Sequence, residues 1–270
     1  MNRQYLIDQI RNKQSYLCVG LDTDPTLIPS HLLKEEDPIF AFNKAIIDAT
    51  LKSCVAYKIN TAFYESQGLK GWMALEKTVK YIPSTHFKIA DAKRGDIGNT
   101  STQYAKAFLQ QLPFDSITIA PYMGEDSVKP FLQFDGKWAI VLGLTSNPGA
   151  ADFELQKMMD GKSLYETVIS KVSSWGSVEN LMFVVGATRP EEFLNLRKII
   201  PDHFLLVPGI GAQGGSLEEI SKKAMNSDVG ILVNVSRDII YASKNQDFAH
   251  KAGEKAASYA VAMSHFLLGH

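Results

Sequence analysis

Short apolar runs rich in β-branched residues recur along the whole chain, and a stretch with helical spacing of apolar positions follows each of them. This alternation predicts parallel strands joined by crossover helices. Several runs are apolar at nearly every position, as in residues 139–142 (Ala-Ile-Val-Leu), which is typical of strands buried on both faces. We expect eight strands, at residues 16–22, 55–60, 86–93, 116–121, 138–146, 181–188, 203–210 and 229–237.

Amphipathic segments separate these runs and predict the helices. The clearest lie at residues 40–54 and 102–112, and a closing helix is predicted at residues 247–268. A further helix is predicted before the first strand, where Tyr5 and Leu6 are followed at helical spacing by Ile10.

Eight β/α units in about 250 residues match the length of one closed barrel. We therefore predict an α/β fold, a single (β/α)8 TIM barrel with an N-terminal helix, and interpret residues 1–270 as one catalytic domain. An open doubly wound sheet is the alternative. The connection after strand 5 is unusually long, since 34 residues separate Ser146 from Leu181. Within this insertion residues 163–175 could form a helix, and residues 147–162 are either a lid or a tolerated surface insertion.

Composition narrows the possible partners. The chain has 28 Lys and Arg residues against 29 Asp and Glu, a net charge of -1, so we expect neither nucleic acid nor an anionic membrane surface as a partner. No run approaches the ~18 to 20 apolar residues of a membrane span. Cys18 and Cys54 read as small buried residues, and we expect a cytoplasmic protein. The histidines lack ligand spacing, so no metal site is expected.

The most informative segment ends the third predicted strand and includes Asp91, Lys93 and Asp96. Residues two apart on a strand face the same side, so Asp91 and Lys93 should project together at the carboxyl end of the barrel, where barrel enzymes keep their active sites. Burying a charge costs several kcal/mol unless it is paired, which favours a network of charges. The alternative is a structural ion pair, with Asp96 capping the next helix.

Two further charged residues end neighbouring strands. Lys58 ends the second strand beside the third, and it either joins the network or extends its amine to the rim. Asp22 ends the first strand, where a carboxylate can accept hydrogen bonds from sugar hydroxyls or cap the following turn.

The last two strands are followed by segments suited to phosphate. Residues 208–215 are rich in glycine, and Ser236 and Arg237 follow strand 8. Glycines let backbone N–H groups approach phosphate oxygens, and an arginine can make a two-pronged contact. Because the loops after strands 7 and 8 bind phosphate in many barrels, we expect a phosphorylated ligand.

Taken together, these motifs resemble the orotidine 5'-monophosphate decarboxylase family, in its longer bacterial branch (type 2). The string Asp-x-Lys-x-x-Asp-Ile-Gly-x-Thr at residues 91–100 is similar to the family signature. The resemblance spans nearly the whole chain, with the remaining motifs in family order at Asp22, Lys58, 145–149, 208–215 and 236–237.

The resemblance implies conversion of orotidine 5'-monophosphate to UMP and CO2, the last step of UMP biosynthesis de novo, with no metal or other cofactor. Lys58, Asp91, Lys93 and Asp96 would form an alternating charge network, with Lys93 as the proton donor. The resemblance also implies a homodimer, in which Asp96 and Thr100 reach into the neighbouring subunit's site.

The remaining implied roles concern substrate binding. Asp22 would bind the ribose and Ser146 the pyrimidine edge, while Gln213 and Arg237, beside Ser236, would bind the phosphate.

Three other interpretations stay open. Related barrel decarboxylases of sugar-acid phosphates share the Asp-x-Lys-x-x-Asp arrangement but use magnesium. A Schiff-base aldolase would need Lys93 as a nucleophile, although flanking carboxylates favour its charged form. A catalytically silent phosphate-ligand protein on the same scaffold is the third.

Overall fold

The computed structural model describes residues 1–211 and 214–268, which include eight strands in a closed barrel. Neighbouring strands pair in parallel in chain order, and β8 pairs with β1 to close the ring. The predicted TIM barrel is therefore confirmed, and the open sheet is wrong. The strands are β1 (Leu17–Gly20), β2 (Ala56–Asn60), β3 (Phe87–Arg94), β4 (Ser116–Ile119), β5 (Trp138–Leu144), β6 (Leu181–Val185), β7 (Phe204–Pro208) and β8 (Ile231–Val235).

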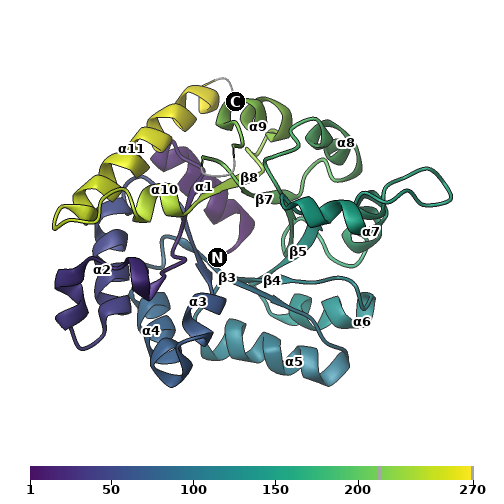
Figure 1. The fold of residues 1–270 in the computed structure, drawn as a ribbon. Coiled ribbons are helices and arrows are strands. Elements are labelled where there is room, and N and C mark those ends of the chain that lie inside the picture. The colour runs from purple at the N-terminus through teal and green to yellow at the C-terminus, as the bar shows by residue number, and fades with distance from the viewer. Residues whose placement is uncertain (212–213, 269–270) are drawn as a thin grey trace.

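Helices surround the barrel (Figure 1). Helix α2 begins two residues before the predicted start because the Asp37 carboxylate caps it, accepting from Phe40 N at 3.1 Å. No described helix is long and apolar enough to span a membrane. The helices are α1 (Arg3–Lys13), α2 (Pro38–Thr50), α3 (Ala62–Glu65), α4 (Gly68–Tyr81), α5 (Gly98–Lys106), α6 (Glu125–Val128), α7 (Leu164–Ser173), α8 (Glu192–Ile199), α9 (Leu217–Ala224), α10 (Arg237–Ile240) and α11 (Phe248–Leu267).

The long connection between β5 and α7 is ordered. A 3-10 helix, Pro148–Asp152, is followed by an antiparallel bridge between Lys157 and Ser163, and Figure 1 shows this segment projecting beyond the ring of helices. The predicted helix at residues 163–175 is confirmed as α7, and Ser163 begins it with a capping box to Glu166.

The interior of the barrel changes character from one end to the other. At the amino ends of the strands, the Trp138 ring meets the rings of Phe87 and Phe204 edge to face, with centroids 5.9 and 6.3 Å apart. Towards the carboxyl ends, the same inward row of β3 leads from Phe87 to the buried carboxylate of Asp91. The barrel interior is thus filled by buried aromatic rings at the amino ends of the strands, here called the base, and by polar groups at the carboxyl ends, here called the mouth.

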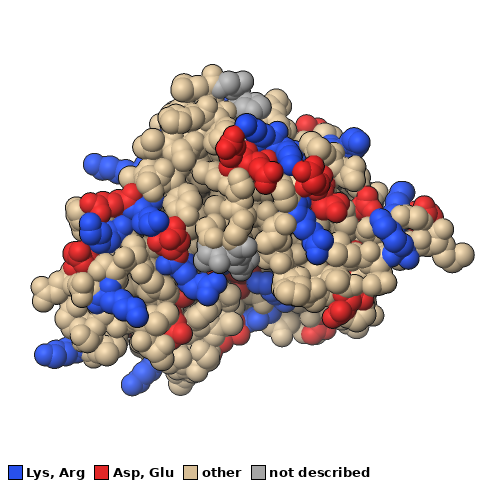
Figure 2. Space-filling model, turned by 45° about the horizontal axis from the view of Figure 1, so that its top comes forward, with Lys and Arg blue, Asp and Glu red and all other residues tan. Residues whose placement is uncertain are grey.

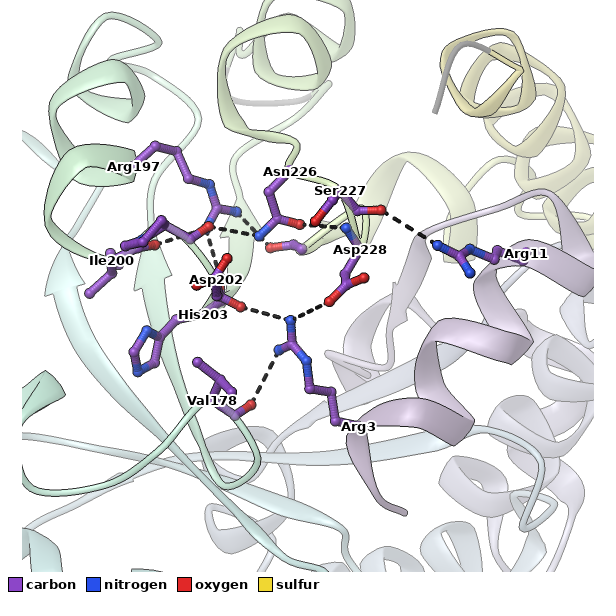
Figure 3. Close-up of polar contacts among 12 residues, drawn as sticks. Arg3, Arg11, Val178, Arg197, Ile200, Asp202, His203, Asn226, Ser227 and Asp228 are labelled. Atoms are coloured by element: carbon purple, nitrogen blue, oxygen red, sulfur yellow. Dashed lines mark hydrogen bonds and ion pairs between the residues drawn. The ribbon is translucent and has the colours of Figure 1, made fainter.

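Helix α1 closes the amino end of the barrel through Arg3, which is 6% exposed. Its Nη2 donates to Asp202 O at 2.8 Å and to Asp228 Oδ2 at 2.9 Å, and its Nη1 donates to Val178 O at 3.2 Å. Figure 3 shows the guanidinium reaching from α1 into the loops that precede β6, β7 and β8. The predicted N-terminal helix is confirmed, and one side chain ties it to three loops.

Replacing Arg3 with methionine should lower the free energy of unfolding by about 1 to 3 kcal/mol, because buried acceptors lose their donor. Catalytic constants should not change, since Arg3 lies at the end of the barrel away from the polar mouth. Arg11→Met is the matched control: Arg11 is exposed, contacts Ser227 O at the long distance of 3.5 Å, and should cost less than about 0.5 kcal/mol. Urea unfolding would measure both, and equal losses would contradict the role of Arg3.

His203 lies beside Arg3 and Arg197 (Figure 3) and is 9% exposed. Neither ring nitrogen has a hydrogen-bond partner among the described residues, and the ring packs edge to face on Phe183. Burial, and then the charges of Arg3 and Arg197, lower the pKa of His203 to about 4. The folded protein therefore resists a proton that the unfolded chain accepts near pH 6.5.

It follows that stability should fall as the pH drops from about 6.5 towards 4. His203→Phe should remove up to about 1.4 kcal/mol per pH unit of this slope. Part of the dependence will remain, because burial and the charge of Lys13 also lower the pKa of His86 to about 4. Urea titrations at several pH values across this window would measure the slope. An unchanged slope in the variant would show that His203 is not a source of acid sensitivity.

Candidate active site

A cavity of about 300 Å³ opens at the carboxyl ends of the strands. This volume is at the lower end of the roughly 300 to 1,000 Å³ typical of small-molecule sites. Apolar side chains from β5, β6 and β7 (Leu142, Val184 and Leu206) form one part of its lining. Figure 2 shows charges of both signs interspersed over the visible face, with no large patch of a single sign.

Four charged side chains form an alternating row along one wall of the cavity. Lys58 Nζ lies 3.1 Å from Asp22 Oδ1 and 3.0 Å from Asp91 Oδ2. Lys93 Nζ lies 2.6 Å from Asp91 Oδ1. The side chain of Lys58 is 5% exposed and that of Lys93 is 50% exposed, so Lys58 is enclosed between carboxylates while Lys93 faces the open cavity.

The row fixes the charge states of its buried members. Burial alone would lower the pKa of Lys58, but the carboxylates of Asp22 and Asp91 outweigh it and raise this pKa. Burial would likewise raise the pKa of Asp91, but the charges of Lys58 and Lys93 hold it well below its usual range. Both groups therefore stay ionised around neutral pH, so Lys58 and Asp91 form a permanent ion pair within the row.

Thr118 on β4 joins the row from the next strand, and the sequence analysis missed it. Its Oγ1 donates to Asp91 Oδ1 at 3.0 Å and accepts from Lys93 N at 2.9 Å. Lys93 has φ +46°, in the left-handed region, and the pairing of β3 with β4 shifts between Ala90 and Arg94. Such a backbone costs about 1 to 3 kcal/mol, which the surrounding contacts must offset.

Asp96 and Thr100 are not among the described residues that line this cavity. Asp96 Oδ1 accepts from the neighbouring Ile97 N at 2.8 Å, while Ile97 itself holds the N-cap position of α5, so the interpretation of Asp96 as the helix cap is wrong. Thr100 lies exposed on α5. Within one chain, the charge row thus consists of Asp22, Lys58, Asp91 and Lys93.

The ends of β7 and β8 form another part of the cavity. Three glycines after β7 have positive φ, namely Gly209 (+101°), Gly211 (+78°) and Gly214 (+84°), and this tight turn suits residues without a side chain. Arg237 and Ser236 line the cavity from the start of α10. Gln213, the other predicted phosphate ligand, lies outside the described residues.

Ser146 lines the wall after β5, between Thr145 and Asn147.

Two asparagines that the sequence analysis missed also line the cavity, Asn60 and Asn234. Asn234 is 7% exposed, and its Oδ1 has no hydrogen-bond partner in the described part of the chain. A polar residue inside the apolar run of β8 was the available signal for it.

Among residues 1–211 and 214–268, no group of three or more His, Cys, Asp or Glu side chains could hold a metal ion.

Residues 15–252 match the family described as "Orotidine 5'-phosphate decarboxylase / HUMPS family". The chain belongs to this family. Two curated relatives named orotidine 5'-phosphate decarboxylase support the decarboxylase branch of that description. The one from Phocaeicola vulgatus is 61% identical, over 95% of each chain, and the one from Flavobacterium johnsoniae is 60% identical, over 95% of this chain and 94% of the relative.

Solved structures agree with the assignment to the orotidine 5'-phosphate decarboxylase family. The OMP decarboxylase of Leishmania donovani has a TM-score of 0.83 and 33% identity, and the match covers 98% of this chain and 99% of that one. The UMP synthase of the same organism has a TM-score of 0.81 and 36% identity, but this chain spans only 56% of its length. The family resemblance seen in the sequence is thus confirmed.

Thr118→Val should lower kcat of the decarboxylase reaction roughly 10- to 100-fold, because it removes hydrogen bonds to both Asp91 and Lys93 while keeping the side-chain volume. Thr167→Val is the matched control, since the buried Thr167 Oγ1 on α7 has no hydrogen-bond partner among the described residues. Steady-state kinetics would compare the two variants. Equal kcat values for Thr118→Val and the wild type would remove Thr118 from the machinery of the site.

Proposed function

We propose that this chain converts orotidine 5'-monophosphate to UMP and CO2 in UMP biosynthesis, with Lys93 as the acid that completes the reaction. The observation that carries the mechanism is the row of alternating charges, in which Asp91 holds Lys93 Nζ at 2.6 Å at the open end of the cavity. A fixed ammonium in this position is suited to stabilising a developing carbanion.

The chemistry requires such a group. When the bond between C6 and the carboxylate breaks, the electron pair stays on an sp2 carbon that has no adjacent electron sink. The ammonium of Lys93 stabilises this charge and then gives C6 a proton, after which the half-exposed amine regains one from water. Asp91, ionised by its two lysine partners, orients the donor.

Substrate binding is divided along the cavity. Arg237, Ser236 and the glycine turn after β7 bind the phosphate, with Gln213 as a further predicted ligand. Asp22 binds the ribose hydroxyls, and Ser146 binds the pyrimidine edge on the opposite wall. Binding energy from the phosphate then helps to orient the reacting ring.

The proposal includes a homodimer in which Asp96 and Thr100 enter the partner's site. Supporting it, Ile97 beside Asp96 is 56% exposed, and Tyr122 and Met123 after β4 are 95% and 44% exposed. The loop after β4 lies close to Asp96, since a Cβ added to Gly95 would lie 3.6 Å from Met123 Cε. Large apolar side chains gathered at the surface mark interaction sites. Thr100 follows on the adjacent first turn of α5.

The cytoplasmic location, the single catalytic domain over residues 1–270 and the independence from cofactors remain predictions. The decisive experiment is turnover of orotidine 5'-monophosphate by protein treated with a chelator, with UMP and CO2 identified as products. Turnover would support the cofactor-free decarboxylase. Absence of turnover in a folded protein that binds UMP would favour the magnesium-dependent relatives or a silent phosphate-binding barrel.

The shared site predicts a specific complementation. Lys93→Ala and Asp96→Ala should each lose more than about 10³-fold in kcat, since each removes a charge that acts at the reacting centre. Mixing the two inactive variants under conditions of subunit exchange should restore activity, because a mixed dimer contains one site with both residues intact.

The control is a mixture of Lys93→Ala with Asp91→Ala, which lie in the same row of one chain and should not complement. If the Lys93→Ala and Asp96→Ala mixture also stays inactive while dimers exchange, Asp96 does not act across the interface.

A further inference from the structure

The wall that carries Ser146 lies beyond the end of β5, so strand pairing does not hold it. Glu154, eight residues further along the connection, contacts this wall directly. Thr145 N donates to Glu154 Oε2 at 2.7 Å, and Thr145 Oγ1 lies 2.9 Å from Glu154 Oε1. The same hydroxyl lies 2.6 Å from Asn147 Oδ1. The Glu154 carboxylate therefore contacts both the backbone and the side chain of Thr145, the residue immediately before Ser146.

The end of β6 supports Ser146 from another direction. A Cβ added to Gly186 would lie 2.8 Å from both the Cβ and the backbone N of Ser146, closer than a Cβ atom approaches a non-bonded heavy atom. Gly186 N also donates to Leu144 O at 2.8 Å. Ser146 is thus confined between Gly186, the residue after β6, where there is no room for a side chain, and the turn that Glu154 holds.

Glu154 is itself anchored to the scaffold. Tyr165 N on α7 donates to Glu154 O at 2.9 Å. Helix α7 packs in turn against β5, where a Cβ at Gly143 would lie 2.7 Å from Ile169 Cδ1. Glu154 therefore connects α7 to the cavity wall, through its backbone O on one side and its carboxylate on the other. This connection gives residues 147–162 a structural role at the cavity, unlike a surface insertion that is merely tolerated.

We propose that Glu154 is a positioning residue for the pyrimidine subsite: it holds Thr145 so that Ser146 presents a fixed contact to the base. This inference rests on the proposed role of Ser146. A carboxylate suits the task because hydrogen bonds to an ionised acceptor are short and roughly twice as strong as neutral ones. A small displacement of a group that positions the substrate can lower the rate by a large factor. Glu154 therefore affects catalysis although it does not itself contact the substrate.

The test compares binding of UMP with binding of ribose 5-phosphate, which lacks the base. Glu154→Ala should weaken UMP binding and raise KM for orotidine 5'-monophosphate about tenfold, a loss typical of a missing charged hydrogen bond, while ribose 5-phosphate binding stays within about twofold. Glu154→Gln keeps an acceptor for Thr145 N and should recover most of the UMP affinity.

Glu166→Ala is the matched control, because Glu166 caps α7 in the same connection and its capping bond goes to Ser163 N rather than to the cavity wall. It should leave the ratio of UMP to ribose 5-phosphate affinity unchanged. Unchanged UMP affinity in Glu154→Ala, or equal weakening of both ligands, would overturn the inference.

Ser146→Ala separates this failure from that of the underlying function. If Ser146→Ala shifts the affinity ratio and Glu154→Ala does not, only the role of Glu154 is overturned. If Ser146→Ala leaves the ratio unchanged while the wild type turns over, the pyrimidine role of Ser146 fails and the inference falls with it, although the decarboxylase activity stands.

Discussion

The ion pairing around Asp91 is the constraint on which the mouth of this barrel depends. One carboxylate, enclosed near the axis, accepts from Lys58, Lys93 and Thr118 on three different strands. A buried charge without such partners would cost several kcal/mol, so the strands must stay in register for the protein to tolerate it. The same contacts also hold the side chain of Lys93, the proposed proton donor, so one carboxylate links the stability of the mouth to the proposed chemistry.

The rest of the structure supplies the rigidity that this arrangement needs. The aromatic rings of Phe87, Trp138 and Phe204 fill the base of the barrel, and α1 covers it. At the mouth, Lys93 has a left-handed backbone conformation, which is unfavourable for a residue with a side chain. In barrel enzymes the amino ends of the strands serve stability and the carboxyl ends carry the active site, and the well-packed base and strained, polar mouth fit this arrangement.

Much of this could be predicted from the sequence. The alternation of apolar runs identified all eight strands, because strands buried on both faces leave a strong pattern. Charged residues at strand ends identified Asp22, Lys58, Asp91 and Lys93 for the same reason: such charges are rare in apolar runs. Thr118 escaped notice because a threonine in a strand is ordinary and its role arises only from the shifted pairing of β3 with β4. Glu154 escaped because its partner lies across a loop whose path no periodic pattern records.

The closure of the base by Arg3 has a consequence for how the chain reaches its fold. The acceptors of this side chain, on Val178, Asp202 and Asp228, lie 175 to 225 residues away in sequence. During synthesis α1 leaves the ribosome long before these loops do. The Arg3 side chain therefore stays solvated until residues 178–228 have also emerged. Contacts of such separation slow folding, because loop closure precedes any gain from them. The Arg3 contacts would therefore form among the last, marking the completed barrel rather than starting it.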